Sequence, residues 1–267
     1  MTAFLEKYFA LTARLRPLPG FLVIGAQKSG TTSLFHYICQ HPKVFENKAK
    51  EIHFFDRHYT HGENWYRARF PLAGSLLSSH QLGEATPYYL CHPHAPTRIA
   101  SLLPQAKLIA ILRNPVDRAI SHYFHEQKKG REELPILEAL QREEERCAEE
   151  WQRMLNDPQY ISKAHQSFSY KQRGIYLEQI KRYLEVFPEE QLLILESSKL
   201  FSKPQAVLKK VFNFLEIDSE VAIPDIAIKN ANPNKKMVPD TVRSYLQDYF
   251  APHNKALQNA LGKDFGW

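Results

Sequence analysis

The sequence predicts an α/β fold, in which a central, mainly parallel sheet is covered by helices on both faces in a three-layer sandwich. Short apolar runs typical of buried strands occur near residues 21–25, 81–84, 107–112 and 191–196, and helical stretches separate them. A chain of 267 residues with 43% apolar content can bury one sizeable core, and it has no internal repeat. We therefore expect residues 1–267 to form a single domain.

The first strand is followed by a loop that predicts an anion site. In FLVIGAQKSGTTSLFHYI, residues 21–38, Gly25 and Gly30 allow tight turns. A predicted helix begins after Gly30 with Thr31, Thr32 and Ser33. Their hydroxyl and backbone N–H groups lie at the helix N-terminus, which attracts phosphate.

This loop is P-loop-like without being a standard P-loop. Gly25 and Gly30 have the spacing of GxxxxGK[ST], but Thr31 stands where that pattern has its lysine, and the lysine lies inside the loop as Lys28. The pattern favours a phosphate-like group held without the usual Mg²⁺-triphosphate arrangement. A tight turn with a threonine at the helix N-cap is the alternative interpretation.

The strand near residues 107–112 leads into a second candidate anion site. It ends at Arg113, and Ser121 follows eight residues later in a predicted helix. A guanidinium at a strand end and a hydroxyl two turns into the next helix can bind one phosphate together. The alternative is that Arg113 simply pairs with Asp117.

With both motifs present in this order, the chain resembles the PAPS-dependent sulfotransferases of bacterial type, where PAPS is 3′-phosphoadenosine 5′-phosphosulfate. GAQKSGTTSL resembles the family's 5′-phosphosulfate loop and RNPVDRAISHY its 3′-phosphate motif, and the resemblance spans nearly the whole chain. It implies transfer of a sulfuryl group from PAPS, release of PAP and no required metal. The implied contacts to PAPS are Lys28, Ser29, Gly30, Thr31, Thr32 and Ser33 at the 5′ end, and Arg113 and Ser121 at the 3′-phosphate.

A late basic segment completes the implied PAPS site. The family commonly has a basic loop over the 3′-phosphate, and Lys235 and Lys236 are the candidates here, although this loop lacks the family's usual Lys-Gly-Arg-like core. A plain solvated loop is the alternative.

The segment KAKEIHFFD, residues 48–56, resembles the KExHFF signature of heparan sulfate sulfotransferases and of some bacterial and natural-product sulfotransferase domains. There the glutamate is the base, so Glu51 inherits that role, and Lys28 would neutralise the leaving oxygen. His53 is the rival base, because imidazole titrates near neutrality. We expect burial beside two phenylalanines to raise the pKa of Glu51, with nearby cations opposing that shift.

The acceptor is predicted only as a class. In GEATPYYL, residues 83–90, Ala85 stands where the heparan sulfate enzymes have a lysine, which weakens the case for a highly anionic polysaccharide. Tyr88 and Tyr89 are the candidate acceptor contacts, with wall packing as the alternative. We expect a hydroxyl or amine of a small natural-product metabolite, with a carbohydrate as the alternative.

Residues 126–170 carry no cofactor motif and are rich in charge. They are expected to form a helical lid or acceptor-binding region, or else a solvated helical insertion. A stripe at helical spacing predicts one packed helix face, formed by Leu137, Leu140, Cys147, Trp151 and Met154.

Composition narrows the remaining possibilities. The net charge of +6 suits a polyanionic nucleotide, but charges alternate in sign instead of forming a nucleic-acid-binding stripe. Three widely spaced cysteines indicate neither a disulfide framework nor a zinc site. These cysteines fit a reduced, cytoplasmic setting. No apolar run reaches ~18 residues, so we expect no membrane segment. Oligomeric state is not specified. A P-loop small-molecule kinase, with Glu196 ordering Mg²⁺, is the rival enzyme class.

Overall fold

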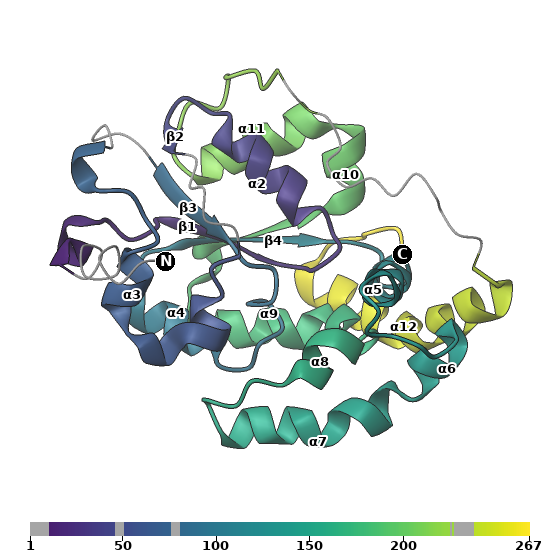
Figure 1. Ribbon diagram of the computed structural model, residues 1–267. Coiled ribbons are helices and arrows are strands. Elements are labelled where there is room, and N and C mark those ends of the chain that lie inside the picture. Colours follow the sequence, from purple (N-terminus) through teal and green to yellow (C-terminus); the bar gives the residue numbers. More distant parts are fainter. Residues whose placement is uncertain (1–10, 46–50, 76–80, 225, 227–237) are drawn as a thin grey trace.

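The computed structural model describes residues 11–45, 51–75, 81–224, 226 and 238–267 (Figure 1). In this part of the chain the central sheet has five strands, and every neighbouring pair is parallel. The strand order is β2-β3-β1-β4-β5, with bounds β1 Phe21–Gly25, β2 Val44–Phe45, β3 Gln81–Ala85, β4 Lys107–Leu112 and β5 Leu192–Glu196. The predicted α/β class and parallel sheet are confirmed.

Side-chain alternation along the central strand divides the core in two. Phe21 and Val23 of β1 pack on one face of the sheet, whereas Leu22 and Ile24 pack on the other. All of β1 is buried, as expected for a parallel strand between two helical layers. The edge strand β2 was not predicted, because a two-residue strand is too short to show a periodic pattern.

One helical layer covers the Phe21 face of the sheet and lies above it in Figure 1. Its helices are α2 (Thr31–Cys39), α10 (Ser197–Ser202) and α11 (Pro204–Phe214). Leu34 of α2 and Leu208 of α11 are fully buried in this half of the core.

The other layer covers the Leu22 face and lies below the sheet in Figure 1. It contains α3 (Glu63–Arg67), α4 (Ala95–Leu102), α9 (Tyr176–Leu184) and the end of α12 (Asp240–Leu261). Shorter helical turns connect these elements, namely η1 Ala13–Leu15, η2 Phe54–His58, η3 Tyr59–His61, η4 Ala73–Ser75, η5 Gln172–Gly174 and η6 Glu189–Gln191.

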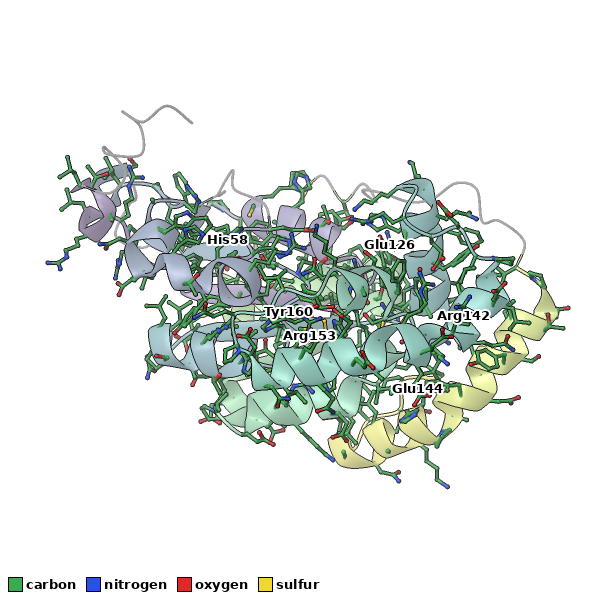
Figure 2. The ribbon with its side chains drawn as sticks, turned by 60° about the horizontal axis from the view of Figure 1, so that its bottom comes forward. His58, Glu126, Arg142, Glu144, Arg153 and Tyr160 are labelled. Atoms are coloured by element: carbon green, nitrogen blue, oxygen red, sulfur yellow. The ribbon has the colours of Figure 1, made fainter. Side chains whose placement is uncertain are left out.

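The charged region 126–170 is built from the end of α5 (Pro115–Lys128), α6 (Ile136–Gln141), α7 (Glu143–Asn156) and α8 (Lys163–Phe168). The predicted helix is interrupted at Arg142, so the stripe is divided between α6 and α7. Glu143, the first residue of α7, is buried and accepts hydrogen bonds from the backbone N–H groups of Lys171 and Gln172. Figure 2 shows Arg142, Glu144 and Arg153 on the surface of this region, and all three are exposed.

Candidate active site

The phosphate loop lies between the carboxyl end of β1 and the start of α2. Gly25 is required here, because a Cβ atom at this position would lie 2.5 Å from the Cβ of Leu90. Gly30 forms the N-cap of α2 in the left-handed region, at φ 97°, where other residues are strained. The two glycines shape a loop that leads directly into the first turn of α2. The backbone N–H groups of that turn have no partner within the helix and can donate to a phosphate.

Lys28 lies within this loop and is itself in the left-handed region, at φ 68°. Burial lowers the pKa of its ammonium group, and the neighbouring cations Arg113 and Lys129 lower it further. Such a concentration of positive charge around a half-buried lysine is unfavourable unless an anion is bound. The loop therefore fits a polyanionic ligand.

Arg113 follows β4 and contacts the phosphate loop directly. Its Nη1 donates to the backbone carbonyl of Lys28 at 3.0 Å, and its own carbonyl accepts from the Tyr176 hydroxyl at 2.8 Å. Asp117, the alternative partner considered for Arg113, lies 3.2 Å from a guanidinium nitrogen of Arg243. The structure thus brings the two predicted anion-binding motifs together at the carboxyl ends of β1 and β4.

The other predicted phosphate contacts occupy different environments. Thr31 and Ser33 are buried in the first turn of α2, Ser29 is also buried, and Thr32 is exposed. Ser121 lies half-buried on α5. The two candidate lysines, Lys235 and Lys236, lie outside the described residues.

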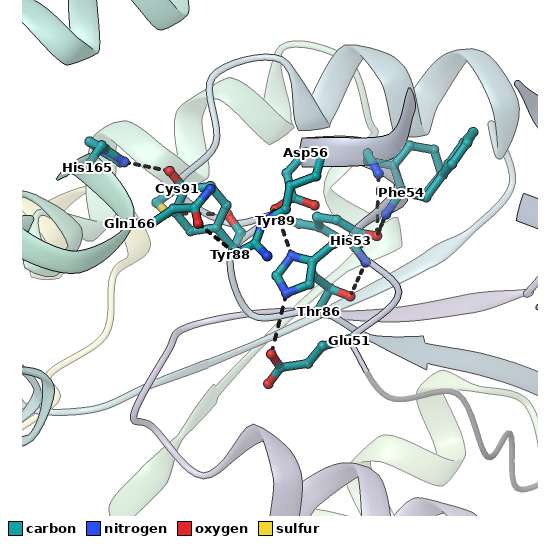
Figure 3. Close-up of polar contacts among 12 residues, drawn as sticks. Glu51, His53, Phe54, Asp56, Thr86, Tyr88, Tyr89, Cys91, His165 and Gln166 are labelled. Carbon is teal, nitrogen blue, oxygen red and sulfur yellow. Dashed lines mark hydrogen bonds and ion pairs between the residues drawn. The ribbon is translucent and has the colours of Figure 1, made fainter. Parts of the chain in front are cut away.

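The candidate base sits in a chain of three charged groups (Figure 3). The carboxylate of Asp56 is fully buried and 2.7 Å from Nδ1 of His53, whose Nε2 is 3.5 Å from Oε2 of Glu51. Glu51, with 56% of its side chain exposed, is the end of the chain that faces solvent. Both Glu51 and His53 have positive φ angles, 46° and 55°, a sparsely populated conformation that occurs preferentially at functional sites.

The interactions among Glu51, His53 and Asp56 determine which of these groups is protonated. Burial lowers the pKa of His53, but the hydrogen bonds to Asp56 and Glu51 outweigh it and raise that pKa to about 9. His53 is therefore protonated at neutral pH and has no free lone pair. The bond from His53 lowers the pKa of Glu51 more than burial raises it, so the expected upward shift is wrong. The two phenylalanines invoked for that shift are buried in the core, where Phe54 stacks on Tyr66 and Phe55 meets Tyr66 edge to face.

A second carboxylate supports the base from below. Glu84 of β3 is fully buried and accepts hydrogen bonds from the hydroxyls of Tyr66, Thr86 and Tyr89, and burial raises its pKa. The Tyr89 hydroxyl in turn accepts from the backbone N–H of Phe54 at 2.9 Å. This network holds the turn that carries the candidate base, Glu51. Sequence reasoning missed it, although a glutamate inside an apolar strand was a visible signal.

These contacts bear on the two predicted acceptor residues. Tyr89 is fully buried with its hydroxyl committed to Glu84, which is the wall-packing alternative, and we leave it out of the proposed acceptor contacts. Tyr88 is 6% exposed, and its hydroxyl lies 2.7 Å from Nδ1 of His165 on α8 (Figure 3). The region 126–170 therefore borders this side of the site through α8.

The acid of the rival kinase interpretation is already engaged. Glu196, at the end of β5, pairs with the ammonium groups of Lys199 at 2.8 Å and Lys263 at 3.1 Å. Within the described residues, no group of three or more histidine, cysteine, aspartate or glutamate side chains is arranged to hold a metal ion. A search of the same residues for a helix long and apolar enough to cross a membrane finds none.

A parallel α/β sheet with a P-loop-like turn at its switch point is typical of enzymes that bind a nucleotide-like anion. The sulfotransferase domain model matches residues 18–256, so the chain belongs to the PAPS-dependent sulfotransferase family. It is a sulfotransferase, and the family resemblance seen in the sequence is confirmed.

Individual relatives agree with this assignment. The chain is 30% identical to the membrane-associated sulfotransferase kil1 of Dictyostelium discoideum, over 95% of this chain and 67% of that protein. It is also 30% identical to mouse heparan sulfate glucosamine 3-O-sulfotransferase 3B1, over 94% of this chain and 65% of that protein. Thus the chain spans about two thirds of these relatives' length. A solved sulfotransferase from Alicyclobacillus acidocaldarius superposes with a TM-score of 0.76 at 30% identity, covering 93% of this chain and 98% of that one.

Proposed function

We propose that this protein transfers the sulfuryl group of PAPS to a hydroxyl or amine of an acceptor, releases PAP, and uses Glu51 as the base. One observation carries the proposal. Thr86 connects the two parts of the proposed site: its backbone N–H donates to the carbonyl of Val23 in β1 at 3.2 Å, and its hydroxyl accepts from the backbone N–H of His53 at 3.4 Å. This contact between the strand that leads into the phosphate loop and the turn that carries Glu51 supports a common site, which sulfuryl transfer requires.

The residues divide the chemistry between them. PAPS supplies a sulfuryl group on a phosphate leaving group, and Arg113, Ser121 and the start of α2 would hold its phosphates. As the acceptor oxygen bonds to sulfur, Glu51 takes the acceptor proton. The electron pair of the breaking sulfur–oxygen bond stays on the phosphate, where the Lys28 ammonium stabilises the charge.

His53 is proposed as a partner of the base. At a pKa of about 9 it is a cation that donates to Glu51, and the buried Asp56 holds it in that orientation. A protonated imidazole cannot accept the acceptor proton. Of the two candidate bases, the charge state therefore favours Glu51.

For the acceptor, the relatives favour the carbohydrate alternative over the small natural-product metabolite that the sequence suggested. The mouse relative is by name a glucosamine 3-O-sulfotransferase, and its similarity covers nearly all of this chain. The cations Arg57 and Lys129 both lower the pKa of Glu51, which supports an acceptor that carries negative charge. We propose a carbohydrate hydroxyl near a negative group, although Ala85 provides no cation. We also propose a cytoplasmic location, where the thiols of Cys39, Cys91 and Cys147 would stay reduced.

The test begins with the donor. Calorimetric titration with PAP, and with adenosine 5′-phosphosulfate as the control that lacks a 3′-phosphate, should show a clear preference for PAP in the wild type. Arg113→Ala should remove that preference. Labelled PAPS is then offered with heparan sulfate oligosaccharides and with a panel of small phenols and amines. Label only in the small molecules would return the acceptor to the metabolite class, and equal binding of both nucleotides would overturn the PAPS site.

A further inference from the structure

Arg173, on η5, is buried at 3% exposure and joins elements on both sides of the site. Its Nη1 donates to Oε1 of Gln27 in the phosphate loop at 2.5 Å. Its Nη2 donates to the backbone carbonyls of His165 at 3.1 Å and Gln166 at 2.8 Å, near the end of α8. One rigid guanidinium plane thus spans the loop and the acceptor-side helix.

The same guanidinium also lies against the wall formed by Tyr88. Its central carbon is 4.6 Å from the centre of the Tyr88 ring, within cation–π distance. Burial lowers the pKa of His165 to about 3, so its ring is neutral, and its Nδ1 is hydrogen-bonded to the Tyr88 hydroxyl at 2.7 Å. Tyr88, His165 and Arg173 therefore form a closed set of contacts.

From α8 the connection continues to the candidate base. Oε1 of Gln166 accepts from Nη2 of Arg57 at 2.6 Å. Nε of Arg57 lies 3.7 Å from the Asp56 carboxylate, which holds His53 in place. At the other end of the connection, Gln27 directly precedes Lys28 in the chain.

We infer that Arg173 is a positioning residue that sets the phosphate loop at the correct distance from the Glu51–His53–Asp56 chain. The inference rests on the proposed function, because it assigns the loop to the donor and Glu51 to the acceptor. In-line transfer depends on this relative placement, and a misplacement of about 1 Å can cost about 100-fold in rate. Binding of PAP alone requires only the loop side. Loss of Arg173 should therefore lower kcat while leaving PAP affinity in place.

The test is a double-mutant cycle between Arg173→Lys and Gln27→Met, with kcat and KM measured for labelled PAPS and the best acceptor from the panel above. PAP affinity is measured by calorimetry and Tm by scanning calorimetry. Gln27 is half-buried, so its substitution should disturb the fold less than a change at the buried Arg173, and it provides a second variant for the test. Arg146→Met is the matched control: Arg146 pairs with Glu132 at 2.8 Å within the same helical region and makes no contact with the phosphate loop among the hydrogen bonds of the described residues.

We expect Arg173→Lys to lower kcat by about 10- to 100-fold while the Kd of PAP changes by less than about threefold. Gln27→Met should lower kcat by a smaller factor, and combining the two should lower it no further than Arg173→Lys alone. The inference would be overturned if the kcat losses of the two single variants multiplied in the double variant. It would also be overturned if Arg173→Lys lost PAP affinity in parallel with kcat, or if Arg146→Met lost as much kcat as Arg173→Lys. If the wild type transfers no sulfuryl group, the proposed function itself fails. Unchanged kcat in Arg173→Lys, with an active wild type, defeats only the positioning role.

Discussion

The raised pKa of His53 predicts a specific pH dependence of stability. The pKa is about 9 in the folded protein and about 6.5 in an unfolded chain, so the folded state binds the proton more tightly. At about 1.4 kcal/mol for each pKa unit, the difference stabilises the fold by about 3 kcal/mol. This stabilisation is fully present below about pH 6.5 and is lost as the pH rises through about 9. The His53 side chain is 15% exposed, so solvent screens the interaction only weakly.

The assay compares urea unfolding of the wild type and His53→Asn between about pH 6 and about pH 10. Lost packing in the variant is independent of pH, whereas the lost charge interaction is not. The difference in unfolding free energy between the two proteins should therefore shrink by about 3 kcal/mol across this range. His61→Asn, at an exposed histidine, is the matched control and should show no such change. If the unfolding free energies of the wild type and His53→Asn changed in parallel with pH, the assigned charge state of His53 would be refuted.

Three further predictions concern the site and its support. Glu51→Gln should lower kcat by about 100- to 10,000-fold, as for loss of a general base, and calorimetry should find PAP affinity unchanged; near-normal turnover would move the role elsewhere. Glu84→Ala leaves three buried hydroxyls without their acceptor and should cost at least about 3 kcal/mol in urea unfolding, and a cost below about 1 kcal/mol would show that the network is not fixed. Gly25→Ala forces a shift against Leu90 and should cost about 1–3 kcal/mol, so an unaltered Tm would contradict the close approach.

The sheet and the phosphate loop were predictable because their signals are local. Four apolar runs coincide with β1, β3, β4 and β5 to within one residue at each end. The spacing of the two loop glycines can be recognised in the sequence without any knowledge of tertiary contacts. Arg113 was predictable for the same reason, since it follows the β4 run directly.

Long-range partners were not predictable. Asp56 is only three residues from His53. Its carboxylate holds the His53 imidazole because it is buried, and that burial depends on packing from distant elements. Gln27 and Arg173 are separated by 146 positions, so no local pattern connects them. The pKa of Glu51 was predicted in the wrong direction, because the sequence does not show that His53 is held against Glu51, where its hydrogen bond lowers the pKa more than burial raises it.

One direct measurement tests whether Glu51 or His53 is the base for transfer from PAPS. Labelled sulfuryl transfer from PAPS is followed for wild type, Glu51→Gln and His53→Asn with heparan sulfate oligosaccharides, beside PAP titrations of all three proteins. We expect transfer by the wild type, near-complete loss in Glu51→Gln, partial loss in His53→Asn and equal PAP affinity in all three proteins. Transfer that persists in Glu51→Gln but disappears in His53→Asn would contradict it and make His53 the base.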